Sequence, residues 1–126
     1  MPALRYWHNH QFEEDIQAAV KAVDKKLCYQ VTDAFCHYLN QAQRHEAELP
    51  LYLLRYVNSI LITAVDAGIH LHEIYPDGLK KTYRELLEVV EPDRERRYIK
   101  CKFIDPVIRV RMEYLESHSN SMLQEI

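Results

Sequence analysis

The segment DAGIHLHEIYPDG, at positions 66 to 78, brings together both glycines of the chain, two histidines and a glutamate. Imidazole and carboxylate groups are suitable zinc ligands, so His70, His72 and Glu73 are candidates for a metal site. Residues two apart point to different sides of a helix, however, and no fourth ligand is spaced nearby. The pattern instead predicts a short helix between two corners, in which His70 is the N-cap and Glu73 reaches back to a free backbone amide. We expect neither a metal nor a cofactor.

The remaining histidines and cysteines form no catalytic pattern. Cys36 and His37 diverge by about 100° around a helix, which is poor geometry for a nucleophile and its base. Cys28, Cys36 and Cys101 have helical spacing and no C-x-x-C motif, which is typical of reduced core thiols in an intracellular protein. WHNH, at positions 7 to 10, is interpreted as a flexible lead-in or a Trp7 anchor on the core. We therefore expect no enzyme, and a metal-dependent enzyme that uses the seven histidines is the alternative.

Charged and aromatic residues favour a solvated surface over a nucleic-acid interface. RERRYIKCK, at positions 94 to 102, interleaves basic residues with Tyr98, but neighbouring acidic residues dilute it and a solvated helix face explains it better. The net charge of −3 lacks the positive excess typical of a chain that binds phosphates by itself. Tyr52, Tyr56 and Tyr83 either belong to the core or line a ligand pocket.

The composition predicts one all-α domain. A chain of 126 residues can bury a core of its own, and 48% hydrophobic with 28% charged residues and only two glycines favours helix. No apolar run approaches the roughly 18 residues of a membrane span, and the start has no signal-peptide core. We expect a cytoplasmic, single-domain bundle of about six helices without membrane contact.

Apolar spacing and capping residues place the first three helices. The stripe from Phe12 to Val23 predicts the first helix, and Asp24 is expected to cap a second that runs to about Gln43. Pro50 fits the first turn of a third helix that ends at Gly68. Because it is apolar on more than one face, we expect the third helix to be central, with a main buried stripe of Leu51, Leu54, Val57, Leu61, Ala64 and Val65.

The last part of the chain is expected to hold a break at a proline. A helix from Leu79 stops before Pro92, and a long segment from about Arg94 follows, with Tyr98, Cys101, Ile104, Ile108, Met112 and Leu115 on its buried side. Asp105 can cap a new helix that has Pro106 in its first position. We therefore predict two helices that meet at Pro106, and Asp105 with Pro106 is the candidate hinge.

The polar sequence SHSNS, from position 117, is expected to end this stripe. Ser121 and Gln124 have the spacing of a capping box that opens another helix, and the chain stops at Ile126, less than two turns later. Isolated helices shorter than roughly 12 residues are marginal in water. We expect the chain to be a fragment of a longer protein.

Residues 49 to 89, LPLYLLRYVNSILITAVDAGIHLHEIYPDGLKKTYRELLEV, resemble the helical segment just upstream of the DNA-binding domain in AraC/XylS-family transcriptional regulators, especially the YesN-like branch. The A-G-I-x-L-x-E-I/V corner of that family is matched by Ala67 to Ile74, although His70 stands where Ser, Thr or Asp is common. Pro106 to Ile108 match a later P-I/V-I step. Residues 12 to 41 are similar to the two-helix beginning of such segments.

The resemblance implies a function for the whole chain. Residues 1 to 126 would form a regulatory or signal-coupling domain, and residues 117 to 126 would be the joint towards an absent helix-turn-helix domain. DNA would be contacted only through that absent domain, and homodimerisation and an unidentified small-molecule effector are compatible with this function. Two alternatives stay open, namely an effector sensor with a pocket between the third and fourth helices, and a free-standing helical adaptor that binds a partner helix.

Overall fold

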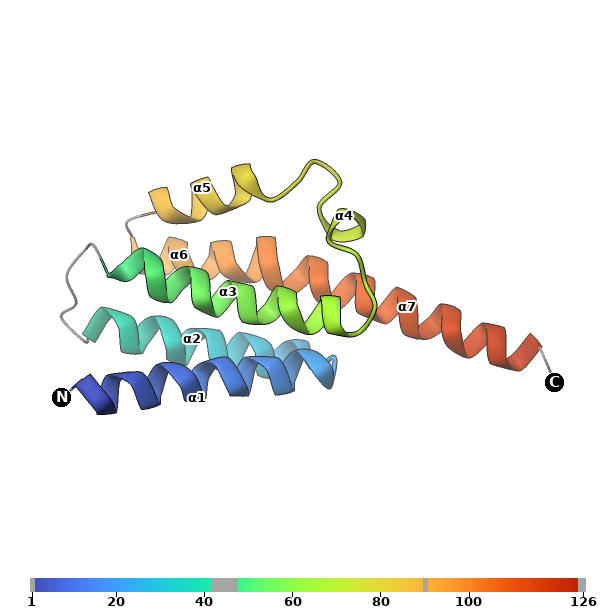
Figure 1. Cartoon of the computed structure of the whole chain (residues 1–126), viewed down its shortest axis with the longest axis horizontal. Helices are drawn as coiled ribbons and strands as arrows, with labels where there is room; N and C mark the ends of the chain where they lie inside the picture. The colour runs from blue at the N-terminus through green and yellow to red at the C-terminus, as the bar shows by residue number, and fades with distance from the viewer. Residues whose placement is uncertain (1, 42–47, 90, 125–126) are drawn as a thin grey trace.

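Helices form the regular structure of this chain, of which a computed structural model describes residues 2–41, 48–89 and 91–124, with side chains from residue 10 to residue 117. Within these ranges no strand occurs, which confirms the predicted all-α bundle. Figure 1 shows the arrangement of the elements, which are α1 (Pro2–Lys21), α2 (Lys25–Gln41), α3 (Leu49–Asp66), α4 (Leu71–Ile74), α5 (Lys80–Glu88), α6 (Pro92–Ile99), the π-helix η1 (Lys100–Ile104) and α7 (Asp105–Gln124).

Helices α1 and α2 form an antiparallel pair joined by a tight corner. Val23 has a positive φ of 53°, and the Asp24 carboxylate accepts a hydrogen bond of 3.0 Å from the Leu27 amide, which confirms the predicted cap. The predicted flexible lead-in at positions 7 to 10 is wrong, because α1 already begins at Pro2, a residue that the first turn of a helix tolerates. The side chain of Trp7 lies outside the described side chains.

Helix α3 is central, as predicted, and contacts α1, α4, α5, η1 and α7. Gly68 ends it in the left-handed region, with φ +91°, and two hydrogen bonds complete a Schellman motif: Gly68 to the Val65 carbonyl at 3.0 Å and Ile69 to the Ala64 carbonyl at 3.1 Å. The apolar Ile69 side chain is buried beside this corner. Leu51 and Val65, which the sequence places in the buried stripe, are instead exposed, and so is the neighbouring apolar residue Ile62.

The core between α1, α2 and α3 is aromatic at its centre. The rings of Phe35 and Tyr56 stack with centroids 3.9 Å apart, and the Tyr56 hydroxyl lies 2.9 Å from the Thr32 hydroxyl. The sequence predicts a stripe on α2 that consists of Leu27, Val31, Ala34, Phe35, Tyr38 and Leu39. The buried residues are instead Cys28, Thr32, Phe35, Cys36 and Leu39, and both Leu27 and Ala34 are exposed. The apolar stripe of α2 is therefore rotated from the predicted one by about one residue.

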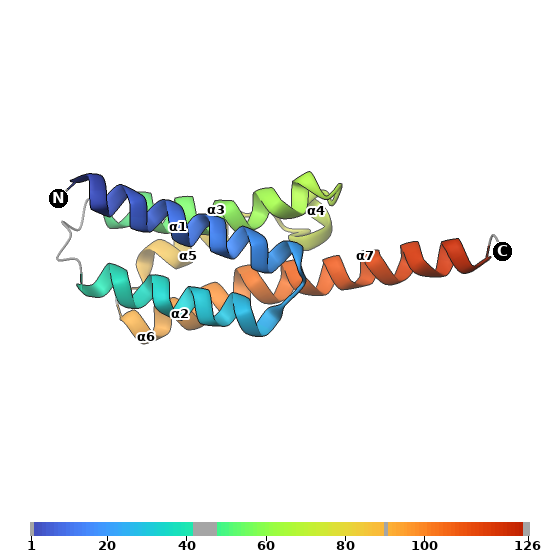
Figure 2. The same cartoon turned by 90° about the horizontal axis from the view of Figure 1, so that it is seen from below.

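Helices α6 and α7 join without a break through η1. The prediction of two helices meeting at Pro106 is wrong, because Asp105 has helical dihedral angles of φ −59° and ψ −47° and the helix continues across it. The predicted break at SHSNS is also wrong, since α7 runs through these residues to Gln124. In both views the later part of α7 extends beyond the other helices (Figures 1 and 2).

Candidate functional site

The π turn at Lys100–Ile104 lies directly before the predicted hinge residues Asp105 and Pro106. The Asp105 amide donates to the Lys100 carbonyl, five residues earlier, which defines a π turn. The Lys102 carbonyl would ordinarily receive a hydrogen bond from residue 106, and proline has no amide hydrogen to donate. The proline thus leaves a backbone acceptor free without ending the helix.

A tyrosine from another part of the fold supplies the missing donor. The Tyr75 hydroxyl donates to the Lys102 carbonyl at 2.7 Å, and Tyr75 belongs to the corner that follows α4. Burial raises the pKa of Tyr75 well above its ordinary value, so this hydroxyl keeps its proton at neutral pH. The corner between α4 and α5 is therefore tied to the π turn by one side chain.

Phe103 of the π turn is the centre of an aromatic cluster. Its side chain is fully buried, and the rings of Tyr75, Tyr83 and Tyr98 have centroids 6.2 to 6.4 Å from its own. The Tyr83 hydroxyl donates to the amide oxygen of Asn58 on α3 at 2.6 Å.

Tyr98 extends the same cluster to α5. Its hydroxyl lies 2.8 Å from the Glu85 carboxylate and 3.2 Å from the Thr82 carbonyl. These tyrosines connect the π turn to α3, to α5 and to the corner after α4. A movement of any of these three elements would therefore change the packing around Phe103.

The opposite side of the π turn carries a polar contact with α2. Asp105 accepts a hydrogen bond of 2.5 Å from the Tyr29 hydroxyl and lies 3.5 Å from the Lys25 ammonium. Lys100 pairs with Asp33 at 2.7 Å, and its ammonium lies 5.0 Å from the centroid of the Tyr29 ring. The predicted hinge residue Asp105 is therefore a side-chain acceptor that holds α2, rather than the helix cap predicted from the sequence.

A buried carboxyl, Glu95, lies on α6 close to this contact. Its side chain is 4% exposed, and burial raises its pKa from 4.5 to about 7. Within the described residues it has no side-chain hydrogen bond. In the sequence, Glu95 is one of the acidic residues that dilute the basic segment at positions 94 to 102, and no signal distinguishes it from Glu91, which is exposed. Its burial depends on how α6 packs against α2.

The three cysteines differ from one another. Cys28 and Cys36 are buried, as predicted, and burial raises their pKa values to about 11 and about 12, which keeps both thiols protonated and unreactive at neutral pH. Cys101 is exposed, so the prediction of a core thiol is wrong there. The prediction assumed 3.6 residues per turn, and the wider π turn changes which positions face the core.

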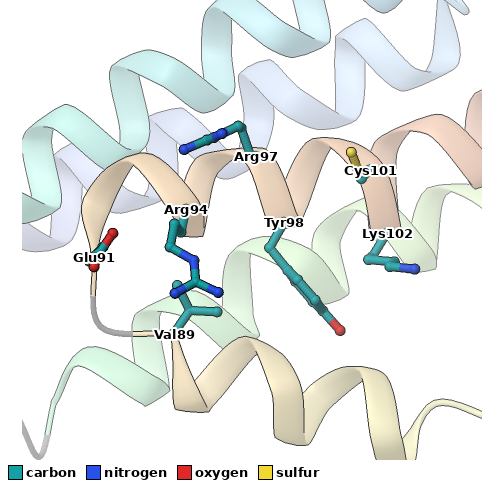
Figure 3. A pocket seen from close by; sticks show the side chains of 7 residues that line it. All are labelled: Val89, Glu91, Arg94, Arg97, Tyr98, Cys101 and Lys102. Carbon is teal, nitrogen blue, oxygen red and sulfur yellow. The ribbon is translucent and has the colours of Figure 1, made fainter.

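Two cavities adjoin the π turn on the side that faces α5. One of about 360 Å³ is lined by Val89, Glu91, Arg94, Arg97, Tyr98, Cys101 and Lys102. In Figure 3, Arg94 and Tyr98 point from α6 towards α5, whereas Arg97 points to the other side of the helix. The second cavity, of about 430 Å³, lies between the corner at positions 74 to 78 and the π turn, and its wall includes Lys102, Pro106 and Arg109.

The tyrosines predicted as pocket-lining residues do not come together in these cavities. Neither cavity is lined by Tyr52, Tyr56 or Tyr83. Tyr56 is fully buried in the core, and Tyr83 is half-buried against Phe103. The prediction that these residues belong to the core is therefore confirmed for Tyr56. Other residues form the walls of the two cavities.

The corner with the histidines folds as a cap. The Glu73 carboxylate accepts a 2.9 Å hydrogen bond from the His70 amide, as predicted. The rings of His70 and His72 are nearly parallel, with centroids 5.5 Å apart, because His70 precedes α4 in an extended conformation. Among the residues that the structure describes, no three His, Cys, Asp or Glu side chains gather where they could hold a metal ion.

Comparisons with models of known families, with curated proteins and with solved structures find no match to this chain. Across the described ranges, none of the helices combines the length and the apolar character needed to cross a membrane. The contacts around the π turn are thus the main structural basis for a functional interpretation.

Proposed function

We propose that this chain is the regulatory, signal-coupling domain of a cytoplasmic AraC-type transcriptional regulator and lacks DNA-binding units of its own. The resemblance of residues 49 to 89 to the segment upstream of the DNA-binding domain in that family supports the proposal. The observation that carries it is the continuous helix from α6 through η1 to α7, since its first part is packed at the aromatic cluster and its last part extends from the bundle.

The proposed mechanism uses the π turn as the point of adjustment. A π turn has weaker hydrogen-bond geometry than an α-helix and often marks a functional position. A change of packing at Phe103, or loss of the Tyr75 hydrogen bond, would alter the direction in which α7 leaves the cluster. Such a change would be transmitted along α7, because a helix moves as a rigid rod over this length.

The first test is the reading frame beyond the codon for Ile126. Two helix-turn-helix units within about 100 further residues are expected. A stop codon directly after Ile126 would contradict the regulator proposal and would favour a helical adaptor.

The second test uses the protein encoded by the whole reading frame. Pro106→Ala restores a backbone donor for the Lys102 carbonyl and is expected to change the response of a target promoter in a transcription reporter assay. Pro92→Ala is the matched control, because Pro92 is exposed in the first turn of α6. An unchanged signal response together with unchanged dimerisation in the Pro106→Ala protein would overturn the proposal.

An effector sensor is the second candidate function, and the two cavities beside the π turn favour it. Arg94 and Lys102 give the first cavity basic groups, so anionic small molecules are the compounds to screen. A compound at about 100 times its dissociation constant would stabilise the domain by about 2.7 kcal/mol, which a thermal-shift assay detects. Absence of any stabilising anion would remove this candidate.

A further inference from the structure

Helix α7 carries an apolar seam that leaves the bundle uncovered. Ile108, Met112 and Leu115 follow one another at spacings of four and three residues. Ile108 is 3% exposed, whereas Met112 and Leu115 are each 50% exposed. The seam therefore begins inside the core and becomes half exposed at Met112 and Leu115, on the helix whose later part extends beyond the other helices (Figure 2).

Alternate spacings of four and three are the a and d positions of a heptad, which pack against a second helix. In the sequence, the same alternation continues through Ser119 to Met122. A contiguous stripe of exposed apolar residues marks an interaction surface. For a heptad seam, the element that covers such a surface is a second helix.

A pocket runs along the same side of α7. Its volume is about 310 Å³, and its walls include Lys25 of α2 together with Asp105, Ile108, Arg109, Met112 and Glu116 of α7. This pocket begins beside the π turn at Asp105 and reaches Glu116 along α7. A helix that covers the seam would thus lie in a preformed depression for part of its length.

We propose that α7 of a second copy of this chain occupies the pocket in antiparallel orientation, so that Met112 of each copy packs against Leu115 of the other. In this register Arg109 of each copy faces Glu116 of the other, since these residues occupy e positions that meet across an antiparallel pair. Both residues are exposed, and within the described residues no ion pair involves either one. The two charge pairs related by symmetry are the reason to name a second copy as the occupant.

A parallel pair would place Arg111 opposite Glu116 of the other copy, as g and e positions do. The Arg111 guanidinium already donates to the Lys21 carbonyl at 3.1 Å, at the end of α1. Among the residues that the structure describes, the Arg109 side chain makes no such hydrogen bond, which favours the antiparallel register. The proposed dimer depends only on the surface of α7 and is independent of the regulatory proposal, so the two can fail separately.

The test is the oligomeric state of the 126-residue chain by sedimentation equilibrium. Arg109→Glu or Glu116→Arg alone places like charges opposite each other and is expected to weaken the dimer about tenfold or more. The double variant restores both pairs and is expected to return the dissociation constant to within about threefold of the original. Glu88→Arg on α5, an exposed residue away from α7, is the matched control and leaves the constant unchanged.

A monomer at all concentrations would overturn the proposal and leave a partner of another kind as the occupant. Restoration of Glu116→Arg by Arg111→Glu rather than by Arg109→Glu would overturn the antiparallel register. Circular dichroism of each variant at the same concentration separates loss of association from loss of folding.

Cysteine cross-linking tests the register directly in a Cys101→Ser background. The remaining cysteines, Cys28 and Cys36, are buried and are not expected to form disulfides. A mixture of the Met112→Cys and Leu115→Cys chains is expected to form a disulfide between the two variants, because a bridge requires Cα atoms within about 7 Å. Oxidised dimers of Met112→Cys with itself would instead indicate the parallel pair.

Discussion

The two halves of the last continuous helix, residues 92 to 108 and residues 109 to 124, differ in what covers them. In the first half, Ile99, Phe103, Ile104, Val107 and Ile108 are buried by α2, α3 and the corner after α4. In the second half, Met112, Tyr114 and Leu115 are exposed. The apolar residues of this half nevertheless have the same helical spacing as those of the first half. Apolar spacing thus reports which face of a helix is apolar, and the neighbouring elements decide whether that face stabilises the fold.

The largest difference between the halves is expected for truncation of an apolar side chain. Phe103→Ala removes a fully buried ring at the centre of the tyrosine cluster and should lower the free energy of unfolding by about 3 to 5 kcal/mol. Leu115→Ala, on the extended half, should change it by less than about 0.5 kcal/mol under conditions where the chain is monomeric. Urea denaturation followed by circular dichroism measures both changes. An equal loss of unfolding free energy in the two variants would contradict the expected difference between the halves.

The next difference concerns a carboxyl in each half, Glu95 and Glu113. The pKa of Glu95 is raised from 4.5 to about 7 in the folded chain, so between these values the unfolded chain releases a proton that the folded chain retains. Stability is therefore highest below pH 4.5 as far as Glu95 is concerned, and it falls as the pH rises to about 7. The loss is on the order of 2 to 3 kcal/mol.

Glu95→Gln should remove this part of the pH dependence and make the chain more stable than the original above pH 7. Glu113→Gln, at an exposed position, is the control and should keep the original pH profile. The measurement is the free energy of unfolding from pH 4 to pH 8. A Glu95→Gln profile parallel to that of the original chain would show that Glu95 titrates normally.

A smaller effect is expected at the border between the halves, where Tyr75 donates to the Lys102 carbonyl. Tyr75→Phe should cost about 1 kcal/mol, because it leaves that carbonyl without a donor. In a Pro106→Ala background the new amide can serve the same carbonyl, so Tyr75→Phe should cost less there. A double-mutant cycle measures the coupling, and strictly additive effects would mean that the proline and the tyrosine act independently.

The smallest expected effect compares two arginines, one on each side of α7. Arg111→Ala removes the hydrogen bond to the Lys21 carbonyl at the end of α1, where a positive charge is favourable, and should cost roughly 0.5 kcal/mol. Arg109→Ala should leave the stability of the monomer unchanged. Thermal unfolding at low ionic strength measures both, since added salt screens such contributions.

The corners of the fold were predictable from the sequence because they depend on local chemistry. Asp24 caps α2, Gly68 provides the left-handed end of α3, and Glu73 reaches back to the His70 amide, all within a few residues of the chain. Helical spacing likewise predicted the number and order of the main helices.

What escaped prediction depends on contacts between distant residues. Pro106 predicted a break because it lacks an amide, and the donor that makes the break unnecessary is Tyr75, which lies 27 positions before Lys102. Burial of Glu95 against α2 and exposure of Met112 follow from where neighbouring helices begin and end. Asp105 and Pro106 therefore lie within a continuous helix rather than at a helix break, and their role as a hinge stays a prediction.

The π turn also has a consequence for evolution by insertion and deletion. A turn closed over five residues holds one residue more than a turn closed over four, and both turns complete about one circle around the helix axis. Deletion of a single residue between Lys100 and Ile104 would therefore convert the turn to an ordinary one and leave Met112 and Leu115 facing the same direction relative to α6. The π turn thus absorbs one extra codon without changing the direction in which the exposed seam faces.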